Sequence, residues 1–218
     1  GAAAMGCSES ALAEYVTIDA GKAQDANGLH SVRLAVTPLG TKVPTMPEAY
    51  HTSVSVDGVE YAFSKMGVRR ANDFSSHRSI GVGGNAWLPG PGVIFDLGVS
   101  PYSGWQMVQA LQQHFLPGTY DMLKKNCNTF TDCAIFFLVQ RRLDQQYAAL
   151  ERFAATADDA IGLVQMLSHY EPNPQAATFE KDRVLERLAG LLRHAVPVQQ
   201  FQPPARSTAR LPVLAVVY

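Results

Sequence analysis

An alternating stretch in the first half of the chain constrains the fold more than any other feature. Apolar and polar side chains alternate from 52 to 56 and again from 59 to 63. Asp57 and Gly58 separate the two runs, and this pair is typical of the turn of a two-residue β-hairpin. We therefore predict a hairpin with one apolar face, and we place His51 at its mouth, on the polar face and away from the main core.

A second strong pattern predicts a core helix. Apolar side chains recur at helical spacing from 127 to 138, which places Cys127 in the first turn at the top of the buried face. Unpaired N–H groups and the positive end of the dipole gather at a helix start, and both favour a thiolate. Cys127 is therefore a candidate nucleophile. The alternative, a small buried hydrophobic residue, is the interpretation that we adopt for Cys133, which lies deeper in the helix.

Weaker patterns predict the elements between the hairpin and the cysteine helix, and the strand before them. Alternation indicates strands at 32–36 and at 93–97. Ser100 and Pro101 are typical of a helix start, so a helix is expected to follow them. Residues 64–92 are predicted to be one long loop, of the kind that forms lids or binding edges.

The composition after the cysteine helix is helical. Residues 141–153 are predicted to continue as a charged helix, and helical patterns then run to 193 with a break at two prolines. Residues 211–218 are apolar and β-prone, which predicts an added strand or a docked tail. The predicted organisation is a tag remnant with a flexible lead-in, a core, and a helical extension whose tail packs on the core: residues 1–29, 30–140 and 141–218.

The totals exclude several classes of function. The 218 residues, 47% of them hydrophobic, suffice for one well-buried core. The net charge of −1 lacks the excess of positive charge that is typical of a protein that binds nucleic acid. The chain has neither zinc-type cysteine spacing nor a phosphate-binding glycine loop, so we expect no metal and no cofactor. Three cysteines are too few for a disulfide scaffold and favour the reducing cytoplasm. Apolar runs stay shorter than a membrane-spanning helix of roughly 20 residues.

The N-terminus nevertheless carries a lipidation pattern. The first four residues resemble an expression-tag remnant, so Met5 is the predicted natural start. Met5-Gly6-Cys7 and the serine at position 10 match the myristoylation pattern, with a cysteine available for palmitate beside the glycine. Two acyl chains would hold the protein on the cytoplasmic face of a membrane, whereas one binds only reversibly. An unmodified N-terminus is the alternative interpretation. Whether the protein forms a homodimer is left open.

Cysteine hydrolysis needs a base and donors for the oxyanion as well as a thiol. His51 is the favoured base because a rigid hairpin positions it, and His77 is a rival in a glycine-rich loop that suits a positioned base less well. The Cys127 backbone N–H is the simplest oxyanion donor. Asn126 and Asn128 are further donor candidates, although asparagine at a helix start is commonly a cap.

Three motifs in this order resemble those of the PPPDE (DeSI-like) cysteine peptidase family. They are Tyr50-His51-Thr52-Ser53, Glu60-Tyr61-Ala62-Phe63 and Asn126-Cys127-Asn128-Thr129-Phe130. The resemblance spans roughly residues 30 to 140, because strands at 32–37 and 93–98 also fit the family. The charged helix predicted after Leu138 departs from the proline-containing segment that is usual there.

The resemblance implies an α+β fold of permuted papain-like type, with a small mostly antiparallel sheet or barrel packed against helices. It implies that Cys127 is the nucleophile and His51 the base of a dyad that cleaves isopeptide bonds of ubiquitin-like modifiers, SUMO or ubiquitin. A second hypothesis is a thioesterase that removes palmitate from protein cysteines with the same dyad. A third is a catalytically silent adaptor that binds modifiers.

Overall fold

The computed structural model describes residues 28–39, 47–78, 91–156 and 170–194. Its strands, in chain order, are β1 (His30–Leu39), β2 (Ala49–Val56), β3 (Val59–Ser64), β4 (Gly67–Asn72) and β5 (Val93–Ser100). The α-helices are α2 (Gly104–Leu111), α3 (Cys127–Val139), α4 (Ala149–Thr156) and α6 (Lys181–His194), with short 3-10 turns η1 (Ser75–His77), η2 (Gln112–His114), η3 (Gln145–Ala148) and η4 (Pro174–Ala176). Among these helices none is long and apolar enough to cross a membrane.

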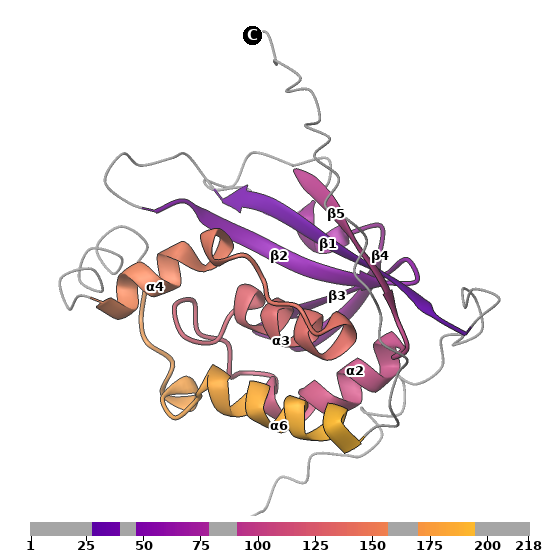
Figure 1. The fold of residues 1–218 in the computed structure, drawn as a ribbon. Helices are drawn as coiled ribbons and strands as arrows, with labels where there is room; N and C mark the ends of the chain where they lie inside the picture. The colour runs from indigo at the N-terminus through magenta and orange to yellow at the C-terminus, as the bar shows by residue number, and fades with distance from the viewer. Residues whose placement is uncertain (1–27, 40–46, 79–90, 157–169, 195–218) are drawn as a thin grey trace, which may run out of the picture.

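The five strands form one antiparallel sheet in the order β4-β3-β2-β1-β5 (Figure 1). The predicted hairpin is confirmed as β2 and β3, and Asp57 and Gly58 turn between them with φ of 53° and 83°. Positive φ at both central residues is what a type I′ turn requires. The sheet stays open, so the expected α+β class is confirmed and the barrel alternative is not.

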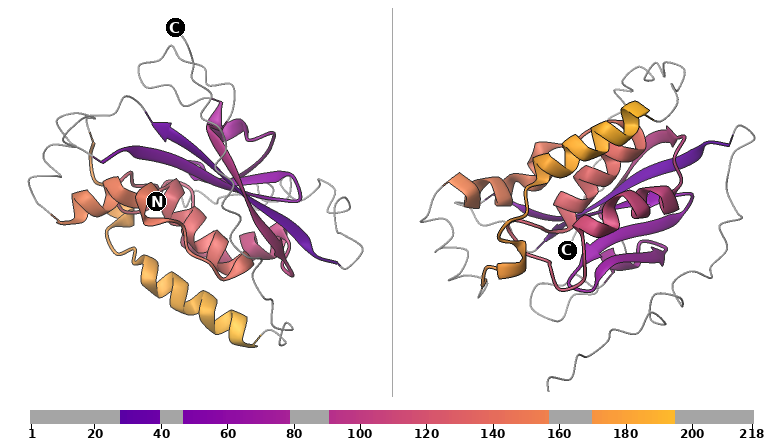
Figure 2. Two further views of the ribbon diagram at one scale, coloured as in Figure 1. Left: turned by 45° about the horizontal axis from the view of Figure 1, so that its top comes forward. Right: turned by 90° about the horizontal axis from the view of Figure 1, so that it is seen from below.

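The helices α2, α3 and α6 lie on one side of the sheet, as both views of Figure 2 show. Helix α3 contacts β2 and β3 on one side and α6 on the other, so it is the central element of the core. Phe63, Phe115 and Phe130 meet there edge to face, with ring centroids 5.0 and 5.2 Å apart. Burial of such a side chain stabilises the fold by about 1.5–3 kcal/mol.

The opposite face of the sheet is polar but also covered. The side chains of Ser53 and Ser55 point there from β2, and Glu60 points there from β3, opposite Ser55 in the register. Each of these three residues is at most 1% exposed. Turn η1 covers this side through His77, which hydrogen-bonds Ser53. A buried polar layer therefore lies behind β2, and His51 belongs to it.

Several predicted boundaries are wrong. Residues 64–92 are not one loop, because Gly67–Asn72 pairs with β3 as an edge strand and η1 follows. Exposed arginines on β4 hid this strand from the alternation pattern. The helix predicted after Ser100 and Pro101 starts later, at Gly104, because Ser103 and Gln106 form a capping box.

The charged helix predicted for 141–153 is wrong in its first four residues. Helix α3 ends at Val139, Gln140 adopts a left-handed conformation with φ of 53°, and helical structure resumes only at Gln145. The apolar segment 211–218 and the lipidation candidates Gly6 and Cys7 lie outside the described residues. Their predictions therefore stay predictions.

A buried carboxylate fixes the extension to the core. Asp132 on α3 accepts two hydrogen bonds from Arg142 at 2.8 Å, one from the Leu143 N–H at 3.0 Å, and an ion pair from Lys181 at 2.9 Å. Burial alone would raise the pKa of Asp132, but the hydrogen bonds from Arg142 and Lys181 outweigh it and leave the pKa below its usual value. The segment after α3 and the start of α6 are thus held at one point.

Close packing at the start of α2 gives a test of the fold. A Cβ atom at Gly104 would overlap the hydroxyl and ring of the buried Tyr61. Gly104→Ala should therefore lower the free energy of unfolding by about 1–3 kcal/mol, measured by urea denaturation. Gly190→Ala in α6 is the matched control, because the nearest atom to its Cβ is the far end of Arg193 at 4.0 Å. It should leave stability unchanged or raise it by up to about 1 kcal/mol. Equal stability of both variants would contradict this packing.

Candidate active site

The first turn of α3 takes the place of a missing strand partner beside β2. Strand β2 begins at Ala49, but its pairing with β3 is confined to Val54–Val56. The Asn128 side chain fills the open edge, where its amide group donates to the Tyr50 carbonyl at 3.0 Å and its oxygen accepts from the Thr52 hydroxyl at 2.9 Å. Because Tyr50 and Thr52 flank His51, these bonds bring the start of α3 to the predicted base.

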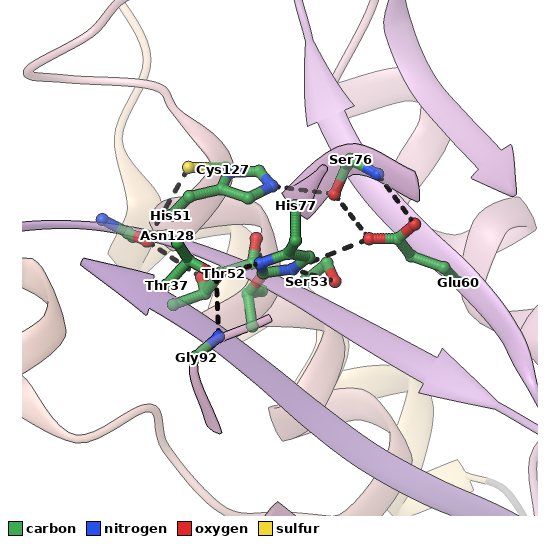
Figure 3. Close-up of polar contacts among 11 residues, drawn as sticks. Thr37, His51, Thr52, Ser53, Glu60, Ser76, His77, Gly92, Cys127 and Asn128 are labelled. Atoms are coloured by element: carbon green, nitrogen blue, oxygen red, sulfur yellow. Dashed lines mark hydrogen bonds and ion pairs between the residues drawn. The ribbon is translucent and has the colours of Figure 1, made fainter. Parts of the chain in front are cut away.

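Cys127 therefore stands at the start of α3, as predicted, and beside β2. Figure 3 draws its sulfur with a dashed line to Asn128, in the same group of side chains as His51. The backbone N–H groups of Thr52, Asn128 and Cys127 itself interact with the sulfur, and the thiol lies 3.7 Å from Asn128 Oδ1. Cys127 is 5% exposed and His51 is 8% exposed. The two predicted residues are thus brought together in a nearly closed site.

Burial keeps both groups neutral. It raises the pKa of the Cys127 thiol to about 11, and the Glu151 carboxylate adds to this while the Thr52 N–H opposes it. Burial and the neighbouring His77 lower the pKa of His51 to about 3. At pH 7 the pair is therefore thiol and imidazole. The thiolate expected from the helix start is not present in this closed site, because desolvation outweighs the backbone donors.

The two asparagines have their donors engaged. Asn126 is the N-cap of α3: its oxygen accepts from the Thr129 N–H at 3.0 Å, and its amide donates to Met122 and to Glu151. The Asn128 amide also reaches Tyr147 O at 2.9 Å and Glu151 at 2.7 Å. Neither amide has a free hydrogen for an oxyanion, so that role stays a prediction. Backbone N–H groups near the sulfur are better placed for it.

His51 has a second polar partner on the far side of its ring. Its Nε2 lies 2.8 Å from Ser76 Oγ, and the Ser76 hydroxyl donates to Glu60 Oε1 at 2.5 Å (Figure 3). His77, the alternative candidate for the general base, is held firmly in the structure. It is fully buried, bonded to Thr37 at 2.7 Å and Ser53 at 2.9 Å, and packed against His51 with ring centroids 4.5 Å apart.

Sequence reasoning missed three neighbours of the pair. Glu151 comes from α4, Ser76 from η1, and Tyr120 from the segment before α3. Burial, and then the nearby Cys127 thiol, raise the pKa of the Tyr120 hydroxyl above its usual value. None of the three has a local signal, since each reaches the site only through tertiary packing.

Two observations on the described residues away from this site bear on where the chemistry lies. No group of three or more metal-ligating side chains is found among those residues. A pocket of about 260 Å³ lies between η2 and α6, lined by His114, Lys125 and Arg187 among others. No candidate catalytic residue lines it, so we place the chemistry at the start of α3 and not in this pocket.

The fold and this site define a class: an α+β protein in which a cysteine at a helix start meets a histidine on a strand, as cysteine hydrolases require. The model of the family described as "PPPDE putative peptidase domain" matches residues 16–167, well over half of the chain. The chain belongs to this family, which indicates a cysteine peptidase and confirms the resemblance of the motifs. The matched region includes α4 and ends before α6. The comparison with curated proteins gives no match.

The neutral thiol predicts an unusual pH dependence of alkylation. With a pKa of about 11, the thiolate fraction of Cys127 should rise about tenfold per pH unit through neutral and mildly alkaline pH. The rate of Cys127 modification by iodoacetamide, followed by peptide mass spectrometry, should therefore still be rising at pH 10. N-acetylcysteine is the control and should level off above its ordinary pKa of about 8.5. A Cys127 rate that is already constant at pH 7 would contradict a neutral resting thiol.

Glu151 gives a second test of the same electrostatics. Its carboxylate raises the pKa of Cys127, so Glu151→Gln should lower that pKa and speed alkylation at pH 8 by several-fold. The glutamine oxygen still accepts from Asn126 and Asn128, which keeps the packing. Glu180→Gln is the control, because that exposed carboxylate pairs with Arg183 on the surface of the extension. An unchanged rate in Glu151→Gln would show that the carboxylate does not act on the thiol.

Proposed function

We propose that this protein is a cysteine isopeptidase that removes ubiquitin-like modifiers, ubiquitin or SUMO, from lysine side chains. Cys127 is the nucleophile and His51 is the base in this proposal. The observation that carries it is the pairing of family membership with the position of Cys127, at a helix start and against the backbone of the residue that follows His51. The modifier end would enter as an extended chain, since a nearly closed site favours small terminal residues.

The neutral pair fixes the order of proton transfers. His51 takes the Cys127 proton as the sulfur attacks the carbonyl carbon of the modifier's last residue, and backbone N–H groups near the sulfur receive the oxyanion. The C–N bond then breaks, and His51 returns the proton to the departing lysine amine. Water, deprotonated by His51, hydrolyses the thioester, which releases the modifier carboxylate and restores the thiol. Binding of substrate must open the site, because Cys127 is only 5% exposed.

A second candidate is the S-acyl thioesterase, and one surface favours it. Val93, Ile94 and Phe95 on the edge strand β5 are 39–44% exposed. Phe95 packs against Tyr147, and Tyr147 packs against Tyr50, the residue before His51. An apolar strip thus runs toward the site, and an acyl chain could lie along it. The same strip also suits the apolar patch of a protein modifier, so substrate profiling must decide.

The test is a panel of ubiquitin and SUMO carrying a fluorogenic amide at the C-terminus, run beside a short acyl-thioester probe. We expect turnover of at least one modifier, loss of all turnover in Cys127→Ala, and a fall in kcat of about 10²–10⁴-fold in His51→Gln. Cys133→Ala is the matched control, because that thiol is fully buried in the hydrophobic core.

The panel also separates the alternatives. Turnover of the thioester alone, lost in Cys127→Ala, would replace the isopeptidase with the thioesterase. A wild-type protein that binds a modifier but turns over neither substrate would favour the adaptor. Equal rates in wild type and Cys127→Ala would remove Cys127 from the mechanism altogether.

A further inference from the structure

A buried carboxylate on the polar side of the sheet has no part in the mechanism above. Glu60 on β3 is 1% exposed, and it lies at the end of a chain of hydrogen bonds that starts at His51 (Figure 3). Its Oε1 accepts from the Ser76 hydroxyl at 2.5 Å, and its Oε2 accepts from the Ser76 backbone N–H at 3.2 Å. Both acceptor oxygens therefore hold one residue, Ser76, in place against the His51 ring.

We propose that Ser76 and Glu60 form a positioning relay that fixes the His51 imidazole with Nε2 protonated and the Nδ1 lone pair available to Cys127. The inference rests on the proposed function, because it supplies the third group that orients the base of the dyad. Ser76 and Glu60 touch neither substrate nor thiol in this role. They act through His51.

The direction of each bond follows from what each atom can do. The Ser76 hydroxyl donates to Glu60 Oε1, and a hydroxyl has only one hydrogen to give. The Ser76 oxygen is then left as an acceptor, and the bond of 2.8 Å to His51 requires a hydrogen on Nε2. A neutral imidazole carries one N–H, so Nδ1 must hold a lone pair. That is the form a general base needs.

The relay also stabilises the charge that forms during the reaction. When His51 takes the thiol proton it becomes an imidazolium, and its Nε2–H then donates to an oxygen that is itself polarised by a carboxylate. Charge-assisted hydrogen bonds of this kind are stronger than neutral ones. Ser76 and Glu60 therefore stabilise the protonated His51 of the transition state more than the neutral His51 at rest. This difference is the condition for an effect on kcat.

The neighbours of Glu60 support a role beyond packing. A buried carboxyl group is costly unless its oxygens are hydrogen-bonded, and besides Ser76 it has His77, whose Nε2 lies 3.7 Å from Glu60 Oε1. Burial lowers the pKa of His77 to about 4, so this ring is neutral at pH 7 and forms no ion pair with Glu60. An apolar residue at this position would cost less. The relay gives a reason for the sequence to keep a carboxyl group here.

The decisive experiment reads the His51 tautomer and the kinetics in the same variants. Two-bond 1H–15N correlation spectra of the free protein should show His51 protonated on Nε2 in the wild type, and a tautomer mixture in Ser76→Ala. With the modifier substrate found by profiling, Ser76→Ala and Glu60→Gln should lower kcat about 10- to 100-fold, as lost orienting partners do, while KM stays within about twofold.

Two variants exclude a merely structural effect. Ser76→Thr keeps the hydroxyl and should restore the wild-type tautomer and most of kcat. Ser55→Ala removes a buried hydroxyl opposite Glu60 in the register that has no hydrogen-bond partner among the described residues, and it should change neither readout. The relay would be overturned by a wild type with the proton on Nδ1, or by a Ser76→Ala protein that keeps both the tautomer and kcat. If the wild type turns over no substrate, the proposed function fails, but the spectra still decide whether the relay exists.

Discussion

The site depends on one side chain, the amide of Asn128. It holds the start of α3 against the part of β2 that β3 does not reach, by bonds to the Tyr50 carbonyl and the Thr52 hydroxyl. The same amide reaches across to Glu151 on α4. Each such buried hydrogen bond is worth only about 0.5–1.5 kcal/mol net, but an unpaired strand edge would cost more. A helix can therefore replace a strand here, and Cys127 meets His51 as a consequence.

Desolvation then decides the resting state of the pair. Three backbone N–H groups face the sulfur and favour a thiolate, yet burial and the Glu151 carboxylate dominate and keep the thiol protonated. His51 is held neutral by the same burial, with His77 beside it. The thiol and the imidazole thus stay unreactive until a substrate opens the site and supplies an electrophile. A buried neutral thiol is also protected from adventitious oxidation, because the thiolate is the reactive form.

The sequence alone predicted those parts whose signal is local. The β2–β3 hairpin follows from alternation and the Asp57-Gly58 turn, and α3 follows from helical periodicity, so the elements that carry His51 and Cys127 could be found. Strand β4 was missed because an exposed edge strand need not alternate. Ser76 and Glu60 lie 16 residues apart, and Ser76 reaches both Glu60 and His51 only after η1 folds back over the sheet, which no local pattern encodes. The thiol pKa was misjudged for the same reason, since burial is a tertiary property.

Electrostatic coupling extends the site to α6. Lys181 pairs with Asp132, and its charge also lowers the pKa of Glu151, against the burial that raises it. Glu151 in turn raises the pKa of Cys127. A cation at the start of α6 therefore acts on the thiol indirectly, by favouring an ionised Glu151. Movement of α6 away from α3 would break the ion pair between Lys181 and Asp132, so the extension contributes to the stability of the fold around the site.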